Sequence, residues 1–217
     1  MVSDSPSFII KDCVLAAIAT GQKAGSLSEF RDKLAAIDLE CVYYHFWGSR
    51  LRPQFIHPDY QNDFASWAFH GLHDQCLAEK LGILDPIEYP NLEDLRKEVL
   101  NVVDDHLETM QMIVWSQNRQ FYFLTSKIII FDTNQKFERP SDFKAHISLI
   151  SNNSIFYHFI DAKRRVPEGK DDFSQWLGMF GDEYSQLIQE IQLIDFYFLS
   201  LPQIKEKLIE LINTYIK

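Results

Sequence analysis

The sequence predicts a predominantly helical α+β protein made of two similar lobes. The first observation is a repeat, because Tyr43-Tyr44-His45-Phe46-Trp47 returns 113 positions later as Phe156-Tyr157-His158-Phe159-Ile160. The second is that each repeat follows a strand-like segment and precedes amphipathic, helix-like segments. We therefore expect an internal duplication with lobes at 1–112 and 113–217, each with one strand and about four helices. The two lobes are predicted to be related by a pseudo-two-fold axis.

The correspondence between the two halves needs no gap over the first third of each lobe. Placing residues 8–46 on 121–159 gives nine identities in 39 positions. The identical pairs are Phe8/Phe121, Thr20/Thr133, Gln22/Gln135, Lys23/Lys136, Ser28/Ser141, Phe30/Phe143, Tyr44/Tyr157, His45/His158 and Phe46/Phe159.

The strand in each lobe is predicted mainly from the second copy. Residues 121–131 are rich in aromatic and β-branched side chains, which favour a strand. Residues 8–19 alone fit a helix or a strand, and the correspondence assigns them to a strand. Pairing of the two strands would satisfy the edges that each leaves open.

Capping signals predict where the helices begin. Ser26-Leu27-Ser28-Glu29 fits a capping box, so a helix is expected from there to about Ile37, after a turn at Thr20–Gly25. Pro140 suits the first turn of the equivalent helix, where its missing N–H costs nothing. The next helix in the second copy is expected to be capped by Ser154 or Asn153.

The later helices carry the remaining candidate residues. The Tyr-His-Phe helices are expected to end near Arg52 and Arg165. Asn62 and Asp171 are the predicted N-caps of the third helix, which in the first copy is expected to continue to Asp85-Pro86. Amphipathic stripes predict a final helix in each lobe, over 92–107 and 201–216.

Composition and charge narrow the class of protein. The 217 residues are 46% hydrophobic with a net charge of −10, which suits a folded protein and disfavours duplex nucleic acid or an anionic membrane as partner. No apolar run reaches membrane-spanning length, and the start lacks a secretion signal. Cys13, Cys41 and Cys76 have no metal-type spacing and are expected to be reduced. We expect a cytoplasmic protein without a cofactor, and homo-oligomers remain open.

The polar residues that match between the copies are the candidate site. A convergent His, Arg, Asp and Trp could bind a phosphate or a sugar. The structural interpretation, which we favour, is an Arg–Asp pair that fixes the turn between helices, a core Trp and a hydrogen-bonded His in an aromatic cluster. The tentative ligand-binding residues are His45, Arg52, Asp63, Trp67, His158, Arg165, Asp172 and Trp176.

Two further patterns are weighed and set aside. His70 and His73, with Asp74 and an upstream His57, have a spacing that can ligate a metal, but no HExxH is present and the second copy has no equivalent. We therefore predict solvated histidines and no metal site. The Thr20-Gly21-Gln22-Lys23 turn could hold an anion, yet it is neither a P-loop nor a GxGxxG, and an ordinary turn is favoured.

The chain resembles an uncharacterised bacterial family, a domain of unknown function. The resemblance covers nearly the whole chain and is carried in the first copy by Thr20-Gly21, Lys23-Ala24, Tyr43-Tyr44-His45, Asn62-Asp63-Phe64-Ala65, Trp67, Glu79, Leu81 and Asp85. Gln22 and Leu84 depart from the family pattern. The second copy also departs, with Asn134 for the Gly and Phe137 for the Ala. The resemblance implies no activity.

The sequence therefore favours a non-enzymatic binding or adaptor protein that engages a protein or a small ligand through the inter-lobe surface. The alternative is an enzyme or sensor that acts on a phosphorylated sugar or nucleotide through His45, Arg52, Asp63 and their equivalents. Convergence of these side chains in a cleft with exposed polar tips would favour the alternative.

Overall fold

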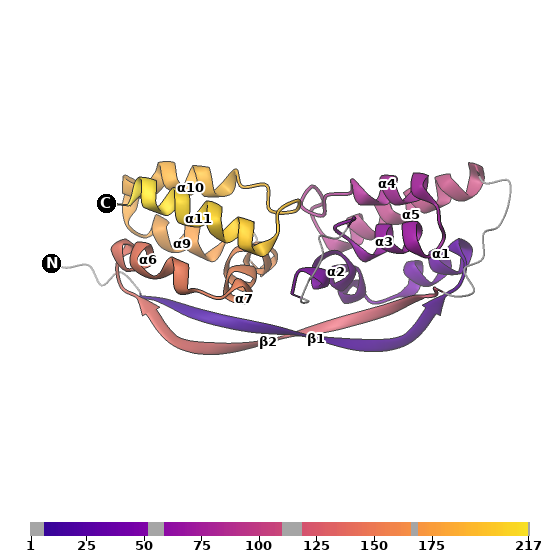
Figure 1. Cartoon of the computed structure of the whole chain (residues 1–217), viewed down its shortest axis with the longest axis horizontal. Helices are drawn as coiled ribbons and strands as arrows, with labels where there is room; N and C mark the ends of the chain where they lie inside the picture. The colour runs from indigo at the N-terminus through magenta and orange to yellow at the C-terminus, as the bar shows by residue number, and fades with distance from the viewer. Residues whose placement is uncertain (1–6, 52–58, 110–118, 166–168, 217) are drawn as a thin grey trace. The chain divides into compact units, whose positions relative to one another are not determined.

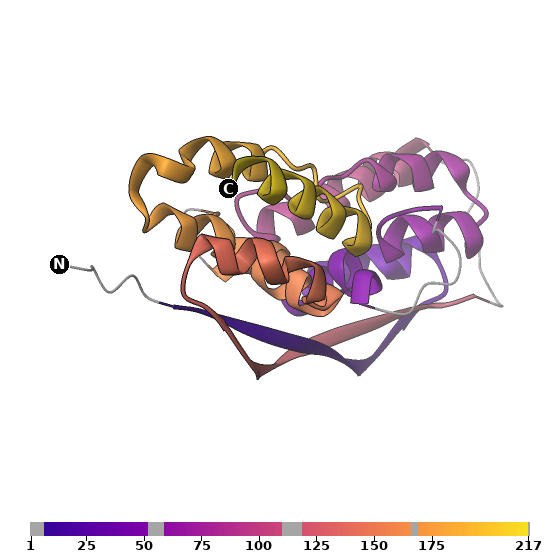
Figure 2. The same cartoon turned by 60° about the vertical axis from the view of Figure 1, so that its left-hand side comes forward.

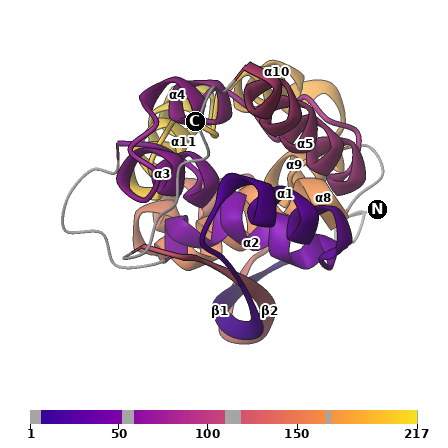
Figure 3. The ribbon, with the colours of Figure 1, turned by 90° about the vertical axis from the view of Figure 1, so that its right-hand side faces the viewer.

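The computed structural model describes residues 7–51, 59–109, 119–165 and 169–216. The fold is predominantly helical with one two-stranded sheet, as predicted (Figure 1). Strands β1 (Phe8–Ala24) and β2 (Phe121–Phe137) run antiparallel and twist about each other (Figures 1 and 3). The predicted pairing of these two strands is confirmed.

The chain divides into two compact units, and the division cuts both strands. We call residues 15–127 the contiguous unit, and residues 1–14 together with 128–217 the composite unit. The composite unit thus includes the first half of β1, which lies beside the part of β2 that leads into α6 (Figure 2). The predicted lobe boundary at 112/113 lies outside the described residues.

The described residues of the contiguous unit form five α-helices beside its part of the two strands. Their bounds are α1 (Leu27–Ala36), α2 (Leu39–Trp47), α3 (Asp63–His70), α4 (Gln75–Gly82) and α5 (Leu92–Thr109), with a 3-10 turn at Gly48–Leu51. Helices α1, α2 and α3 contact Phe121 of β2. Ser26 caps α1 as predicted, accepting the Glu29 N–H. Asn62 likewise caps α3 by accepting the Ala65 N–H.

The prediction of one long third helix in the first half of the chain was wrong, because the helix is interrupted between α3 and α4. His73 has a left-handed φ of 57°, which ends helical geometry. Asp74 then accepts the Leu77 N–H and caps α4 as a new helix. The stretch between them begins at Gly71, where a Cβ would overlap the Trp67 ring.

The helices of the composite unit follow one another along the chain in a similar order to those of the contiguous unit, with more short 3-10 and π-helical segments between them. Its elements are α6 (Pro140–His146), η2 (Ile147–Leu149), α7 (Asn152–Ile155), η3 (Phe156–Asp161), α8 (Ala162–Arg165), α9 (Asp172–Gly178), η4 (Gly181–Tyr184), α10 (Ser185–Gln192) and α11 (Leu201–Tyr215). The predicted cap at Ser154 or Asn153 was wrong, since Ser151 accepts the Ser154 N–H and caps α7. Segment η3 is a π-helical turn that continues α7 into α8.

The predicted turn at Thr20–Gly25 was also wrong, because β1 continues to Ala24. A left-handed residue lies at the equivalent point of each strand, Gly21 with φ 76° and Asn134 with φ 58°. Glycine adopts this conformation freely, and asparagine is among the few other residues that tolerate it. The difference in residue type at this point, Gly21 against Asn134, is therefore compatible with the same backbone conformation in both strands.

Aromatic rings fill the core of each unit. In the contiguous unit Phe30 contacts Phe121, Phe123, Phe64 and Trp67. The composite core likewise gathers rings from the N-terminal strand, β2, α6 and α9, namely Phe8, Phe137, Phe143, Phe173 and Trp176.

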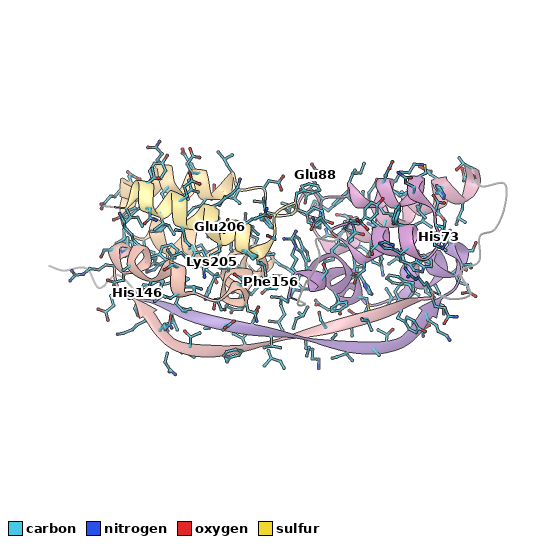
Figure 4. All side chains as sticks on the ribbon, viewed as in Figure 1. His73, Glu88, His146, Phe156, Lys205 and Glu206 are labelled. Atoms are coloured by element: carbon cyan, nitrogen blue, oxygen red, sulfur yellow. The ribbon has the colours of Figure 1, made fainter. Side chains whose placement is uncertain are left out.

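Two further contacts in the composite unit involve side chains of α6 and α11. His146 at the end of α6 stacks on Phe137, and Lys205 of α11 donates to the Ile150 carbonyl (Figure 4).

Among the described helices, none combines the length and the apolar character that crossing a bilayer requires.

Candidate functional site

In the contiguous unit, a buried histidine joins two helices to a strand. His45 lies in α2, and its Nδ1 is 2.9 Å from Oδ2 of Asp63 in the first turn of α3. The backbone N–H of Leu124 in β2 donates to Nε2 of His45 over 3.0 Å. Because Nε2 accepts a hydrogen bond, the imidazole proton lies on Nδ1 and is donated to the Asp63 carboxylate.

The composite unit repeats this arrangement with different partners. Nδ1 of His158 is 2.7 Å from Oδ2 of Asp172, which opens α9. Its Nε2 accepts the backbone N–H of Lys11 over 2.9 Å. The strand residue held in this unit is thus 147 positions away from the histidine.

We call each His, Asp and strand N–H set a histidine latch: His45, Asp63 and Leu124, and His158, Asp172 and Lys11. Both nitrogens of each ring are occupied, and His45 and His158 are only 2% and 3% exposed. A general acid or base must exchange a proton with a substrate, which these rings could do only by giving up the strand N–H at Nε2 or the Asp carboxylate at Nδ1. The latches therefore support the structural interpretation of the matched histidines.

Arg165 in α8 supports the composite latch. Its Nη2 donates to Asp172 Oδ2 and to the Tyr157 carbonyl, both over 2.9 Å, and its Nε donates to Asp161 over 3.0 Å. The guanidinium also lies 4.1 Å from the centre of the Tyr157 ring. The Arg–Asp pair expected between these helices is thus formed in the composite unit. Arg52, its predicted equivalent, lies outside the described residues.

The electrostatics of the composite latch favour an ionised carboxylate. Burial acts to raise the pKa of Asp172, but hydrogen bonds from His158 and Arg165 outweigh it and lower the pKa below its ordinary value. The same carboxylate therefore stabilises the composite unit at neutral pH while it orients the His158 ring.

The two matched tryptophans lie in the cores. Trp67 and Trp176 are 8% and 3% exposed, and Nε1 of Trp67 donates to the Arg119 carbonyl over 2.8 Å. Each packs against a phenylalanine of the strand end, Trp67 against Phe121 and Trp176 against Phe8. Neither offers the open ring face that stacking on a sugar would need.

An open depression lies beside each latch. The one in the contiguous unit has a volume of about 570 Å³ and is lined partly by His45, Asp63 and Trp67. The one in the composite unit, of about 310 Å³, is lined partly by the predicted residues His158, Arg165, Asp172 and Trp176, with Lys11. Seven of the predicted residues are thus brought together as two sets, each within one unit.

The sequence did not predict the strand residues of the latches, Lys11 and Leu124, or three side chains that pack beside the latches. Phe8 and Phe121 pack on the latch histidines at 4.9 and 4.7 Å between ring centres, and their identity between the copies was a usable signal. Asp161, a 2% exposed carboxylate paired with Arg164 and Arg165, has no counterpart because glycine occupies position 48 of the first copy.

Two of the residues weighed as metal ligands, His70 and Asp74, have other partners. His70 pairs with Asp59 at 3.2 Å, and Asp74 is 2.6 Å from Nε2 of His106. No group of three or more metal-ligating side chains occurs among residues 7–51, 59–109, 119–165 and 169–216. His57 lies outside the described residues.

The fold and latches define a class of helical two-unit proteins in which paired strands are secured by buried histidines. Residues 5–213 match a family described as a family of unknown function, DUF5752, and the chain belongs to that family. This agrees with the resemblance to an uncharacterised domain family. No curated protein matches the sequence.

One solved structure shares this architecture over nearly the full length of both chains. It is described as the structure of OrfY from Thermoproteus tenax. The two are 25% identical with a TM-score of 0.81, and the match covers 98% of this chain and 97% of that one. This chain and OrfY therefore share one fold over nearly the full length of both chains.

Proposed function

We propose that this protein is a non-enzymatic binding or adaptor protein. The observation that carries the proposal is the exposed apolar surface of the two strands. Most of the exposed large hydrophobic side chains in the described residues lie there, while single ones elsewhere are ordinary. Those on the strands are Ile9, Val14, Ile18, Tyr122, Ile129, Ile130 and Phe131.

The composite unit holds the denser part of this surface. Ile129 is 56% exposed, and Ile9, Ile130 and Phe131 are each 46% exposed. Clustered apolar groups on a soluble surface are typical of a protein-binding site. We therefore place the binding surface on the strands of the composite unit, in place of the inter-lobe surface expected from the sequence.

The latch geometry supports a non-enzymatic role. Each histidine accepts a strand N–H at Nε2 and bonds an Asp carboxylate at Nδ1. Arg165 directs its bonds to Asp161, Asp172 and the Tyr157 carbonyl. The equivalent contacts of His45 and His158 also support a common ancestor for the two halves. We infer an internal duplication whose matched polar residues were kept for folding.

The experiment is affinity capture with a matched control in the same unit. The double variant Ile129→Asp/Phe131→Asp should lose a partner that the wild-type chain retains, because two charges disrupt an apolar interface. Leu149→Asp, at a 70% exposed side chain away from the strands, should retain it. Equal recovery by all three chains would refute the proposed surface.

A second candidate, binding of a phosphorylated sugar or nucleotide, is favoured by one observation. In the composite depression Lys11 and Arg165 both contribute to the lining beside Asp172 and Gln175. Two cations near an open surface could hold a phosphate. Calorimetric titration with glucose 6-phosphate and AMP tests it: binding that Lys11→Ala abolishes would support this candidate, and no binding would remove it.

A further inference from the structure

The composite unit is completed by a strand that arrives from the other end of the chain. Its helices and most of its core come from residues 128–217, whereas the first 14 residues supply one strand segment. Within that segment Phe8, Ile10 and Cys13 are 9%, 1% and 0% exposed. The segment is therefore part of the core of the composite unit. The residues that separate it from the rest of this unit in the sequence, 15–127, form the contiguous unit.

Besides its backbone pairing with β2, four side-chain contacts hold this segment. The Lys11 N–H donates to His158, and the Thr133 hydroxyl donates to the Ile10 carbonyl over 2.7 Å. The Ser151 hydroxyl donates to Asp12 over 2.9 Å, and the Cys13 thiol lies 3.4 Å from the Asn153 carbonyl. Residues 128–217 thus form the surface that contacts the side chains and the backbone of Ser7–Val14, and we call this surface the seat.

The point where β1 passes from one unit to the other, between Val14 and Leu15, is partly exposed, with Leu15 and Ala16 half-buried. Val14 is 49% exposed and Ile18 is 41% exposed, and Ala17 between them is exposed as well. Release of the segment costs its core contacts, its backbone pairing with β2 and the side-chain bonds described above, and all of these form again when the segment of a second copy takes its place.

We propose that Ser7–Val14 is an exchangeable strand, and that a second copy of this chain can supply it to the composite unit. In a reciprocal exchange each copy donates its segment to the other, so that the same contacts form in the closed monomer and in the dimer. The two forms then differ chiefly in association entropy and in the strain at residues 14–15, and protein concentration shifts the balance.

A second copy is the occupant that the contacts favour. The seat takes a ring at position 8, a branched aliphatic side chain at position 10 and a small group at position 13. Its backbone bonds require the N–H of residue 11 and the carbonyl of residue 10 in the same register. Another copy meets all of these requirements with the identical segment.

The test mixes two populations of the full-length protein that carry different affinity tags. After incubation at high concentration, tandem capture and size-exclusion chromatography with light scattering should reveal mixed dimers that accumulate slowly. An excess of a synthetic peptide of residues 7–14, made with Cys13→Ser to prevent oxidation, should suppress them, and a scrambled peptide should not. Only monomers, or dimers that the peptide leaves unchanged, would overturn the proposal.

The two latches provide a matched pair of variants. His158→Ala should speed the exchange about tenfold, since losing a hydrogen bond of roughly 1.4 kcal/mol changes a rate by that factor. His45→Ala should leave the exchange rate unchanged, because His45 holds Leu124, which belongs to the contiguous unit. Equal acceleration by both variants would contradict a strand released from the composite unit alone.

A milder pair covers the case in which the histidine variants do not fold. Thr133→Val removes the bond to the Ile10 carbonyl, and Thr20→Val removes the equivalent bond to the Phe123 carbonyl in the contiguous unit. Faster exchange with Thr133→Val but not with Thr20→Val supports the proposal. No change with either variant would overturn it.

Discussion

The contiguous and composite units use the same latch on strands of different origin. In the contiguous unit, His45 holds Leu124, and both residues belong to one unbroken stretch of chain. In the composite unit, His158 holds Lys11, which comes from the start of the chain. The surroundings differ too, because a regular helix carries His45 and a π-helical turn carries His158.

The difference teaches what these matched residues do. A catalytic or binding role would require similar surroundings for the reacting atoms, yet Leu124 in one depression is replaced by Lys11 in the other. The bonds common to both units are those between His, Asp and a strand N–H. Attachment of a strand is therefore the role that the comparison supports, and it can be broken or sharpened by variants made in pairs.

The largest effect is expected from the strand-end phenylalanines. Phe8→Ala and Phe121→Ala should each lower the free energy of unfolding by about 3–5 kcal/mol, because each removes a buried ring. Hydrogen exchange should locate the damage, with Phe8→Ala deprotecting residues 9–14 and leaving the contiguous unit protected. Loss of protection in the contiguous unit instead would show that the units do not respond separately.

The latch histidines come next. His45→Ala and His158→Ala should each cost about 1–3 kcal/mol of unfolding free energy, since each leaves a half-buried carboxylate and a strand N–H without this partner. Chemical denaturation measures the loss. His70→Ala, at a 43% exposed side chain, serves as the control and should change little. A control loss equal to that of the latch variants would argue against the latch.

Acid should weaken the composite latch. The pKa of Asp172 is lowered on folding, although burial opposes this, because His158 and Arg165 donate to the carboxylate. Its stabilising contribution is complete above the unfolded pKa of about 3.9 and is lost as the pH falls through the lower folded value. Asp172→Asn should therefore destabilise the protein at pH 7 and much less at pH 2–3, as urea midpoints would show; the exposed Asp182→Asn should be neutral at both.

The smallest effect is expected at the left-handed strand positions. Gly21→Ala should cost roughly 1–2 kcal/mol, because a side chain is strained at φ 76°. Asn134→Gly should change stability by less than about 1 kcal/mol, since relief of strain opposes the greater freedom of the unfolded chain. A neutral Gly21→Ala, measured by thermal unfolding, would mean that the two strands differ at this point.

Much of the fold could be predicted from local signals. The β-branched and aromatic residues of 121–131 predicted β2, and the caps at Ser26, Asn62 and Asp171 set the starts of three helices. These signals act between neighbouring residues and so can be read directly from the sequence. No local signal predicts that the matched His and Asp residues pair with each other, but their recurrence in both halves of the sequence identified them as candidates.

Other features depend on contacts that the sequence does not reveal. The cap at Ser151 was missed because Asn152, Asn153 and Ser154 offered equally suitable side chains. The π-helical turn at Phe156–Asp161 carries no distinctive pattern. The assignment of residues 8–14 to the helices of the second half depends on tertiary packing, so periodicity along β1 could predict a strand but not which unit it completes.

The reactivity of the buried Cys13 thiol reports whether the N-terminal strand is attached to the composite unit. Burial, followed by the charges of Asp12 and Asp161, raises the pKa of Cys13 to about 12, so an alkylating reagent finds almost no thiolate. Cys41 is sealed in the contiguous unit, and Cys76 is exposed. The native chain thus carries a reporter on the N-terminal strand, an internal reference in the contiguous unit, and an accessible thiol that calibrates the reagent.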